Sequence, residues 1–149
     1  MNLQEQKERL DLLGAYQKQQ ESMRERLQGT DIGKTLCHSP ENIAESKIRV
    51  MDDLIDLAGE TPALTSMKEE LFTQWNALVD GEHPELLGKL STPVELFTAR
   101  IEVAEQAIEA LQKEIDLSLP DDVLADLGME RGRCYDRRDQ LTVIWYPGL

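Results

Sequence analysis

The segment 29–35 has residue types that could bind a phosphate. It reads Gly-Thr-Asp-Ile-Gly-Lys-Thr and approaches the pattern GxxxxGK[ST], in which a glycine-rich turn points its backbone N–H groups at a nucleotide phosphate. Only three residues separate the two glycines, where that turn needs four, and no strand pattern precedes the segment. We therefore interpret it as a helix end followed by a polar linker, and predict no nucleotide site there.

One acidic pattern could bind magnesium on the surface of a helix. Asp52, Asp53 and Asp56 have the spacing DDxxD, which aligns carboxylates in all-α enzymes that bind magnesium and diphosphate. Such enzymes also need a second acidic cluster and basic anchors for the diphosphate, and neither is present at a recognisable spacing. The pattern is that of a solvated helix face, and we predict no metal there.

A magnesium-dependent nucleotide pyrophosphohydrolase is the alternative enzyme hypothesis. Small all-α members of this class line the interior of a helical bundle with paired carboxylates. The acids that could imitate this arrangement lie on two predicted helices: Glu69, Glu70, Glu102, Glu105 and Glu109. The last three lie opposite the apolar face of their helix, where solvent is expected, and the tight EExxE pattern is absent. The pyrophosphohydrolase hypothesis therefore stays an alternative.

Sulfur and imidazole side chains are too scattered for a zinc site. Cys37, His38, His83 and Cys134 include no CxxC or HxxxH pair, and an adjacent Cys and His can seldom reach the same ion. No serine, cysteine or lysine has a local nucleophile signature. We therefore predict a non-enzymatic protein with no catalytic residue, cofactor or metal. Two cysteines without a secretory signal favour free thiols and a cytoplasmic location.

Charge is the strongest functional signal. The formal net charge is −13, and residues 29–132 contain 22 acidic against 8 basic side chains, whereas residues 1–28 are balanced. Direct nucleic-acid binding is disfavoured, because phosphate contacts need Lys and Arg. The acidic surface serves either solubility or, as an alternative function, mimicry of nucleic acid in the basic cleft of a DNA- or RNA-binding protein. Its predicted members are Glu95, Glu102, Glu105, Glu109 and Asp116.

The two ends of the chain are the predicted partner-binding segments. Residues 1–28 form a mixed-charge, coiled-coil-like helix whose apolar seam is interrupted by Gln17, Gln20 and Arg24, so it is expected to protrude and to pair with another helix. Residues 128–149 combine an arginine-rich segment with an apolar tail that the bundle or a partner must cover. A homodimer through the N-terminal helices is the expected assembly. The predicted contact residues are Leu10, Leu13, Leu27, Arg133, Arg137, Arg138, Ile144, Trp145 and Tyr146.

The helix predicted over residues 92–117 organises the other elements. Thr92-Pro93-Val94-Glu95 opens it as a capping box with proline in the first turn. Its two apolar stripes together cover roughly 220° of the circumference at about 100° per residue. A surface helix needs an apolar arc only about 100° wide, so we expect neighbours on more than one side. The main stripe is Val94, Phe97, Ile101, Ala104, Ile108, Leu111 and Ile115.

The whole chain is predicted to be one all-α domain of residues 1–149. It is an irregular four- to five-helix bundle around the central helix at about 93–117, with a helical core over 40–127. Ser39-Pro40 and Thr61-Pro62 start two helices, Gly59 and Gly81 end them, and a shorter helix is expected near 121–127. A helical pattern resumes over 129–140, and residues 141–146 are strand-like before a short extended tail. No apolar run is long enough to span a membrane.

These observations favour an inhibitor or adaptor that binds a protein partner through its terminal segments and acidic surface. We predict no direct nucleic-acid binding and no membrane association. The short, single-domain character is compatible with an accessory protein of a phage or mobile element.

Overall fold

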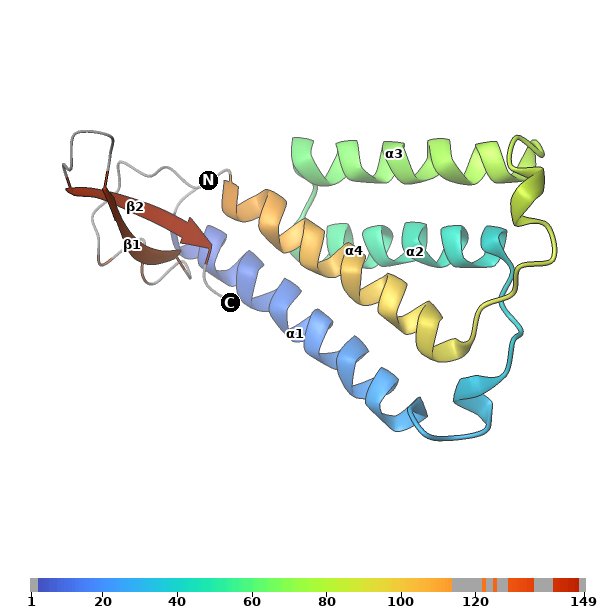
Figure 1. Cartoon of the computed structure of the whole chain (residues 1–149). Helices are drawn as coiled ribbons and strands as arrows, with labels where there is room; N and C mark the ends of the chain where they lie inside the picture. Colours follow the sequence, from blue (N-terminus) through green and yellow to red (C-terminus); the bar gives the residue numbers. More distant parts are fainter. Residues whose placement is uncertain (1–2, 114–121, 123–124, 126–128, 136–140, 148–149) are drawn as a thin grey trace.

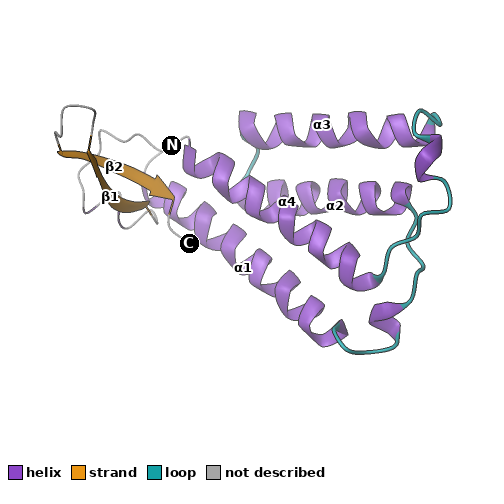
Figure 2. Ribbon diagram, viewed as in Figure 1, coloured by secondary structure: helices purple, strands orange, loops and turns teal. Residues whose placement is uncertain are grey.

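Within residues 3–113 the chain folds into four α-helices, and a two-stranded β-hairpin follows (Figures 1 and 2). The computed structural model describes residues 3–113, 122, 125, 129–135 and 141–147. The helices are α1 (Leu3–Leu27), α2 (Pro40–Ala58), α3 (Pro62–Val79) and α4 (Pro93–Lys113), with the short 3₁₀ turns η1 (Ile32–Lys34) and η2 (Pro84–Leu86) in the loops. The strands are β1 (Met129–Tyr135) and β2 (Leu141–Pro147). The predicted all-α helical bundle is confirmed.

The bundle consists of two antiparallel helix pairs, α1 with α4 and α2 with α3, that cross at an angle (Figure 1). Helix α4 contacts α1, α2 and α3, which confirms that it has neighbours on more than one side. Helix α2 also contacts the three others. The centre of the bundle is therefore shared by α2 and α4, whereas the sequence pattern placed α4 there alone.

Polar side chains start the helices where the sequence predicts. The hydroxyl oxygen of Ser39 accepts a hydrogen bond from the backbone N–H of Asn42 (3.1 Å), and that of Thr61 caps α3 in the same way. At the start of α4, Glu95 N–H donates to Thr92 Oγ1 (3.1 Å) while Thr92 N–H donates to Glu95 Oε1 (3.3 Å), which is a capping box. Such caps satisfy N–H groups that have no partner inside the helix.

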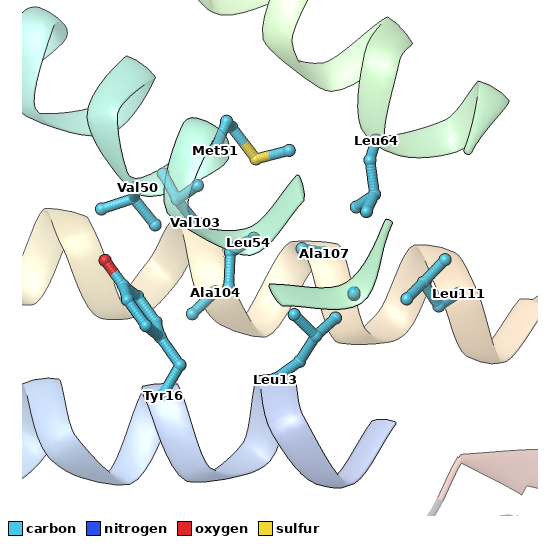
Figure 3. Close-up of a cluster of buried hydrophobic side chains, with 11 residues drawn as sticks. Leu13, Tyr16, Val50, Met51, Leu54, Leu64, Val103, Ala104, Ala107 and Leu111 are labelled. Carbon is cyan, nitrogen blue, oxygen red and sulfur yellow. The ribbon is translucent and has the colours of Figure 1, made fainter. Parts of the chain in front are cut away.

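The apolar core lies between α1, α2 and α4 and reaches the first turn of α3 (Figure 3). Helix α2 contributes the most buried side chains, and the small residues of α4 allow the neighbouring helices to approach closely. Helix α3 contributes one fully buried residue, Leu64, so its apolar face is only partly covered. The core residues are Leu13, Tyr16, Val50, Met51, Leu54, Ala58, Leu64, Val103, Ala104, Ala107 and Leu111.

The C-terminal segment differs from the prediction. Residues 129–135 form β1 and not the predicted helix, while the strand predicted over 141–146 is confirmed as β2. The two strands pair antiparallel from Met129–Pro147 to Tyr135–Leu141. The β-branched residues of β2 favour an extended chain, and an extended strand recruits a partner through its free N–H and C=O groups.

Part of the predicted fifth helix lies outside the described residues. Asp122 and Ala125 are described, and both are helical. Residues 114–117 of the predicted central helix, including Asp116, also lie outside, as do Arg137 and Arg138. Among the helices that the structure describes, none combines the length and the apolar character that a membrane span requires.

Candidate functional site

Helix α1 does not protrude but packs along α4, which corrects the prediction of a free N-terminal arm. Leu13 is completely buried in the core, and Leu10 and Leu27 are half-buried. Leu13 is therefore not available to a partner. The polar residues that interrupt the seam have polar partners on α4: Gln17 donates to Glu105 Oε1 and Arg24 donates to Thr98 Oγ1, both at 3.3 Å.

A partly buried polar network around Arg100 joins α1, α2 and α4. The guanidinium donates from Nε to Gln20 Oε1 (2.8 Å), from Nη1 to Ser46 Oγ (2.8 Å) and from Nη2 to the Tyr16 hydroxyl (3.2 Å). The Tyr16 hydroxyl in turn donates to Asp53 Oδ2 (2.9 Å). Burial, and then the hydrogen bond to Asp53, raise the pKa of Tyr16 to about 12. A phenol of that pKa stays protonated at neutral pH, so the network is a structural link and not an acid–base pair.

This network was not predicted from the sequence, although the sequence contains signals of it. Gln20 occupies a seam position on α1 where an apolar residue was expected, and Arg100 lies within the helix that was predicted to have apolar residues over most of its circumference. A buried polar side chain usually has a hydrogen-bond partner. Two polar residues at core-facing positions of neighbouring helices are therefore a signal that they bind each other.

A hollow of about 220 Å³ opens between α3 and α4. Each helix contributes four residues spaced i, i+3, i+4 and i+7, which is a two-turn face. One lysine from α2 completes the lining. The residues of this α3–α4 groove are Met67, Glu70, Leu71 and Gln74 of α3, Ala99, Glu102, Val103 and Gln106 of α4, and Lys47.

The groove brings together two of the five carboxylates named for the pyrophosphohydrolase alternative. Glu70 and Glu102 line it, whereas Glu69, Glu105 and Glu109 do not. Across the described part of the chain, no three His, Cys, Asp or Glu side chains lie close enough together to hold a metal ion. The pyrophosphohydrolase hypothesis is therefore supported by two carboxylates that line one groove, but not by a set of metal ligands among the described residues.

The DDxxD residues make structural interactions. Asp52 forms an ion pair with Lys68 of α3, and Asp53 accepts the hydrogen bond from Tyr16. Asp56 is exposed. Cys37 is an exposed free thiol, and Cys134 lies in β1. These positions provide no recognisable catalytic or metal-binding arrangement.

The predicted acidic surface on α4 is exposed to solvent. Glu95, Glu102, Glu105 and Glu109 are all exposed, and Glu109 pairs with Lys113 at 3.2 Å. Seven residues are nearly two helical turns, so Glu95, Glu102 and Glu109 form one row along α4. This row runs beside the α3–α4 groove, because Glu102 belongs to both.

Five aliphatic side chains are exposed at the end of the bundle where the α1–α2 and α3–α4 loops meet. We refer to these residues as the aliphatic loop end: Ile32 (71% exposed), Leu36 (60%), Val79 (52%), Leu87 (76%) and Leu90 (46%). A hollow of about 80 Å³ lies between the start of α2 and the α3–α4 loop, and of these five residues Leu87 and Leu90 line it. Figure 1 shows the two loops side by side. Exposed apolar side chains gathered at one end of a bundle indicate a candidate interaction site.

Backbone hydrogen bonds hold the two loops together. His38 and Ser91 form an isolated antiparallel bridge, in which Ser91 N–H donates to His38 O (2.8 Å) and His38 N–H donates to Ser91 O (3.0 Å). The turn η1 packs on α4. Gly33, from the rejected phosphate-binding pattern, is buried, and a Cβ there would collide with the carbonyl of Leu27. The segment 29–35 is thus a helix end followed by a tight turn, as interpreted from the sequence.

The remaining predicted contact residues that the structure describes lie in the hairpin. Arg133 is in β1, paired with Val143, and Ile144, Trp145 and Tyr146 are in β2. The apolar tail therefore forms a strand with a partner strand of its own chain. No family model matches this chain, and neither a curated protein nor a solved structure is significantly similar to it.

Proposed function

We propose that this protein is a non-enzymatic interaction module, an adaptor or inhibitor, that binds an apolar segment of a protein partner at the aliphatic loop end. The observation that carries the proposal is the exposure of five aliphatic side chains at one end of the bundle, four on two adjacent loops and Val79 at the end of α3. Burying a Leu or Ile side chain fully contributes roughly 1.5–3 kcal/mol. Covering five that are about half to three-quarters exposed contributes a free energy of the same order as the cost of lost rigid-body freedom, so polar contacts at the rim have to add to it.

Preorganisation of the loops supports the same proposal. Flexible loops lose conformational entropy when they bind, which lowers affinity. Here the His38–Ser91 bridge joins the loops and η1 packs on α4, so the loop backbone is ordered before a partner arrives. Exposed leucines that bind no partner promote aggregation. An ordered loop backbone presents such leucines in one arrangement, which favours a specific contact.

The charges around the loop end indicate the chemistry of the partner. Glu41 lines the hollow, and the adjoining loop exposes Glu82 and Glu85 against one lysine, Lys89. A backbone hydrogen bond, and then the hydrogen bond between His83 Nδ1 and Glu85 Oε1 (3.0 Å), lower the pKa of the Glu85 carboxyl. Carboxylates at the rim of an apolar site favour partners with basic flanking residues. We therefore expect an aliphatic segment flanked by Lys or Arg.

Nucleic-acid mimicry has one observation in its favour, the exposed glutamates of α4. From Glu95 to Glu109 that surface carries four carboxylates over about 21 Å of helix axis, which is roughly one per 7 Å. Duplex DNA carries one phosphate per about 1.7 Å. The lower density of charge makes mimicry the second candidate, and the steep salt dependence that it requires is a direct test.

The test compares two double variants of the full chain as affinity baits. Leu87→Ser/Leu90→Ser removes apolar surface from the loop end, and Leu12→Ser/Leu57→Ser removes exposed leucines from α1 and α2. Each bait is incubated with soluble extract of the source organism, and bound proteins are quantified by mass spectrometry. We expect a partner that wild type and the control retain equally and that the loop-end variant loses by about tenfold or more.

Three results would contradict the proposal. Equal retention by both variants would show that the loop end is not the contact. A dimer in light scattering that only the loop-end variant dissociates would replace the partner by a second copy of the chain. Magnesium-dependent nucleotide hydrolysis lost in Glu70→Gln would show that the protein is an enzyme.

A further inference from the structure

We propose that the α3–α4 groove binds an amphipathic helix that carries Lys or Arg beside its apolar face, supplied by a protein partner. This site is separate from the aliphatic loop end. The inference combines three features of the groove: its two helical walls, its uncovered apolar floor and its acidic rim.

The shape of the groove fits a helix. Both walls are two-turn helical faces with spacing i, i+3, i+4 and i+7, the spacing with which one helix meets another. The α4 wall includes Ala99 and Val103, whose small side chains let a helix backbone approach to the usual 8–10 Å between helix axes. The hollow of about 220 Å³ is smaller than the 300–1,000 Å³ typical of small-molecule sites.

The floor of the groove leaves apolar surface uncovered. Val103 is buried, but Met67, Leu71 and Ala99 are only half-buried. Met67 and Leu71 follow Leu64 along α3 at helical spacing, and only Leu64 is fully buried. An additional helix in the groove would complete the burial of this stripe.

The rim of the groove determines which helix it would favour. Glu70 and Glu102 face the groove from opposite walls, and neither has an ion-pair partner in the described part of the chain. Glu95 extends the acidic row by two turns along α4, and Lys47 is the single base in the lining. With a net charge of −13 for the whole chain, a cationic helix is attracted and an acidic one is repelled.

The experiment titrates a model helix into the ¹⁵N-labelled full chain. The probe is a synthetic peptide of about 18 residues, roughly 27 Å of helix, with leucines spaced i, i+3, i+4 and i+7 and lysines elsewhere. A second peptide replaces every lysine by glutamate. We expect saturable amide shifts confined to residues 67–74 and 99–106 with the lysine peptide, and none there with the glutamate peptide.

Matched charge reversals locate the contact. Glu70→Lys/Glu102→Lys changes both walls of the groove, and Glu69→Lys/Glu105→Lys makes the same charge change on the same two helices outside it. We expect the first pair to weaken binding by about tenfold and the control pair by no more than about threefold, since only the first pair contacts the peptide. If the charge-reversed variant does not fold, Glu70→Gln/Glu102→Gln replaces it, and we expect this variant to bind the lysine peptide about threefold more weakly than wild type.

The inference is overturned if both reversals weaken binding equally, if the glutamate peptide binds as well as the lysine peptide, or if the shifts map elsewhere. The loop-end variant Leu87→Ser/Leu90→Ser should bind the lysine peptide as wild type does. This result separates the groove from the proposed function, because each surface can fail its test while the other passes.

Discussion

Replacing Leu13 with alanine tests whether α1 is an integral part of the bundle. Leu13 is 0% exposed and packs in the core that α2 and α4 also form. Truncating a buried leucine removes its transfer free energy and leaves a cavity, at a cost of about 2.7–5 kcal/mol. We expect the free energy of unfolding to fall by about 3 kcal/mol. For a urea slope of about 1.5–2 kcal/mol per molar, the unfolding midpoint would fall by about 1.5–2 M.

The neighbouring residue provides the control. Leu12 lies in the same helix and is 43% exposed, so Leu12→Ala makes the same chemical change and the same change in helix propensity without opening a cavity. We expect it to cost less than about 1 kcal/mol. Unfolding is followed by circular dichroism at two protein concentrations. Equal small shifts for both variants would refute the packing of α1, and a concentration-dependent shift for Leu13→Ala would support a helix that pairs between chains.

Three further predictions follow from burial and hydrogen bonding. One of the three tyrosines should titrate late in ultraviolet absorbance, because the pKa of Tyr16 is raised from 10.0 to about 12, and Tyr16→Phe should remove that late phase. The pKa of Tyr16 is higher in the folded than in the unfolded state. The contribution of the protonated Tyr16 to stability is therefore complete below about pH 10 and is lost as the pH rises toward 12. Gly33→Ala should lower the thermal midpoint through its collision with the end of α1, whereas Gly14→Ala, with open space around it, should raise the midpoint slightly. Ile101 is 3% exposed, so Ile101→Ala should lower the free energy of unfolding in urea by about 2–5 kcal/mol, whereas Glu105→Ala should lower it by less than about 0.5 kcal/mol. Equal effects of the two substitutions would refute the assigned burial of α4.

The helix boundaries were predictable because they depend on neighbouring residues. Ser39, Thr61 and Thr92 each precede a proline, and each accepts the capping hydrogen bond that this pattern implies. The exposure of the α4 glutamates followed from the same local periodicity. Local sequence contains the information for both features.

Long-range pairing was less predictable. Residues 129–135 contain Gly132 and two arginines, which favour no element strongly, and their strand is specified by β2 across the hairpin. The aliphatic loop end was missed for a similar reason. Leu36 and Leu90 are far apart in sequence, and a backbone bridge between their loops brings them to one surface.

The polar interruptions in α1 were misread because a sequence pattern does not reveal partners. Gln17, Gln20 and Arg24 suggested a helix that a bundle could not hold, yet each has a hydrogen-bond partner on α4. A polar residue weakens a helix interface when it stays unsatisfied and specifies the register when it is satisfied. The buried Gln20, bonded to Arg100, is therefore the polar residue that contributes most to how α1 lies on α4, and the exposed Gln17–Glu105 hydrogen bond contributes least.

The distribution of these polar links explains why the groove lies between α3 and α4. Arg100 ties α1, α2 and α4 together, and Lys68 ties α3 to Asp52 of α2. Among the described residues, no side-chain hydrogen bond or ion pair joins α3 to α4, and Leu64 is the one α3 side chain that is fully buried. An incoming helix would therefore have no polar contact to break between these two helices. The affinity for such a helix depends on the groove residues themselves, which is why the charge reversals are placed there.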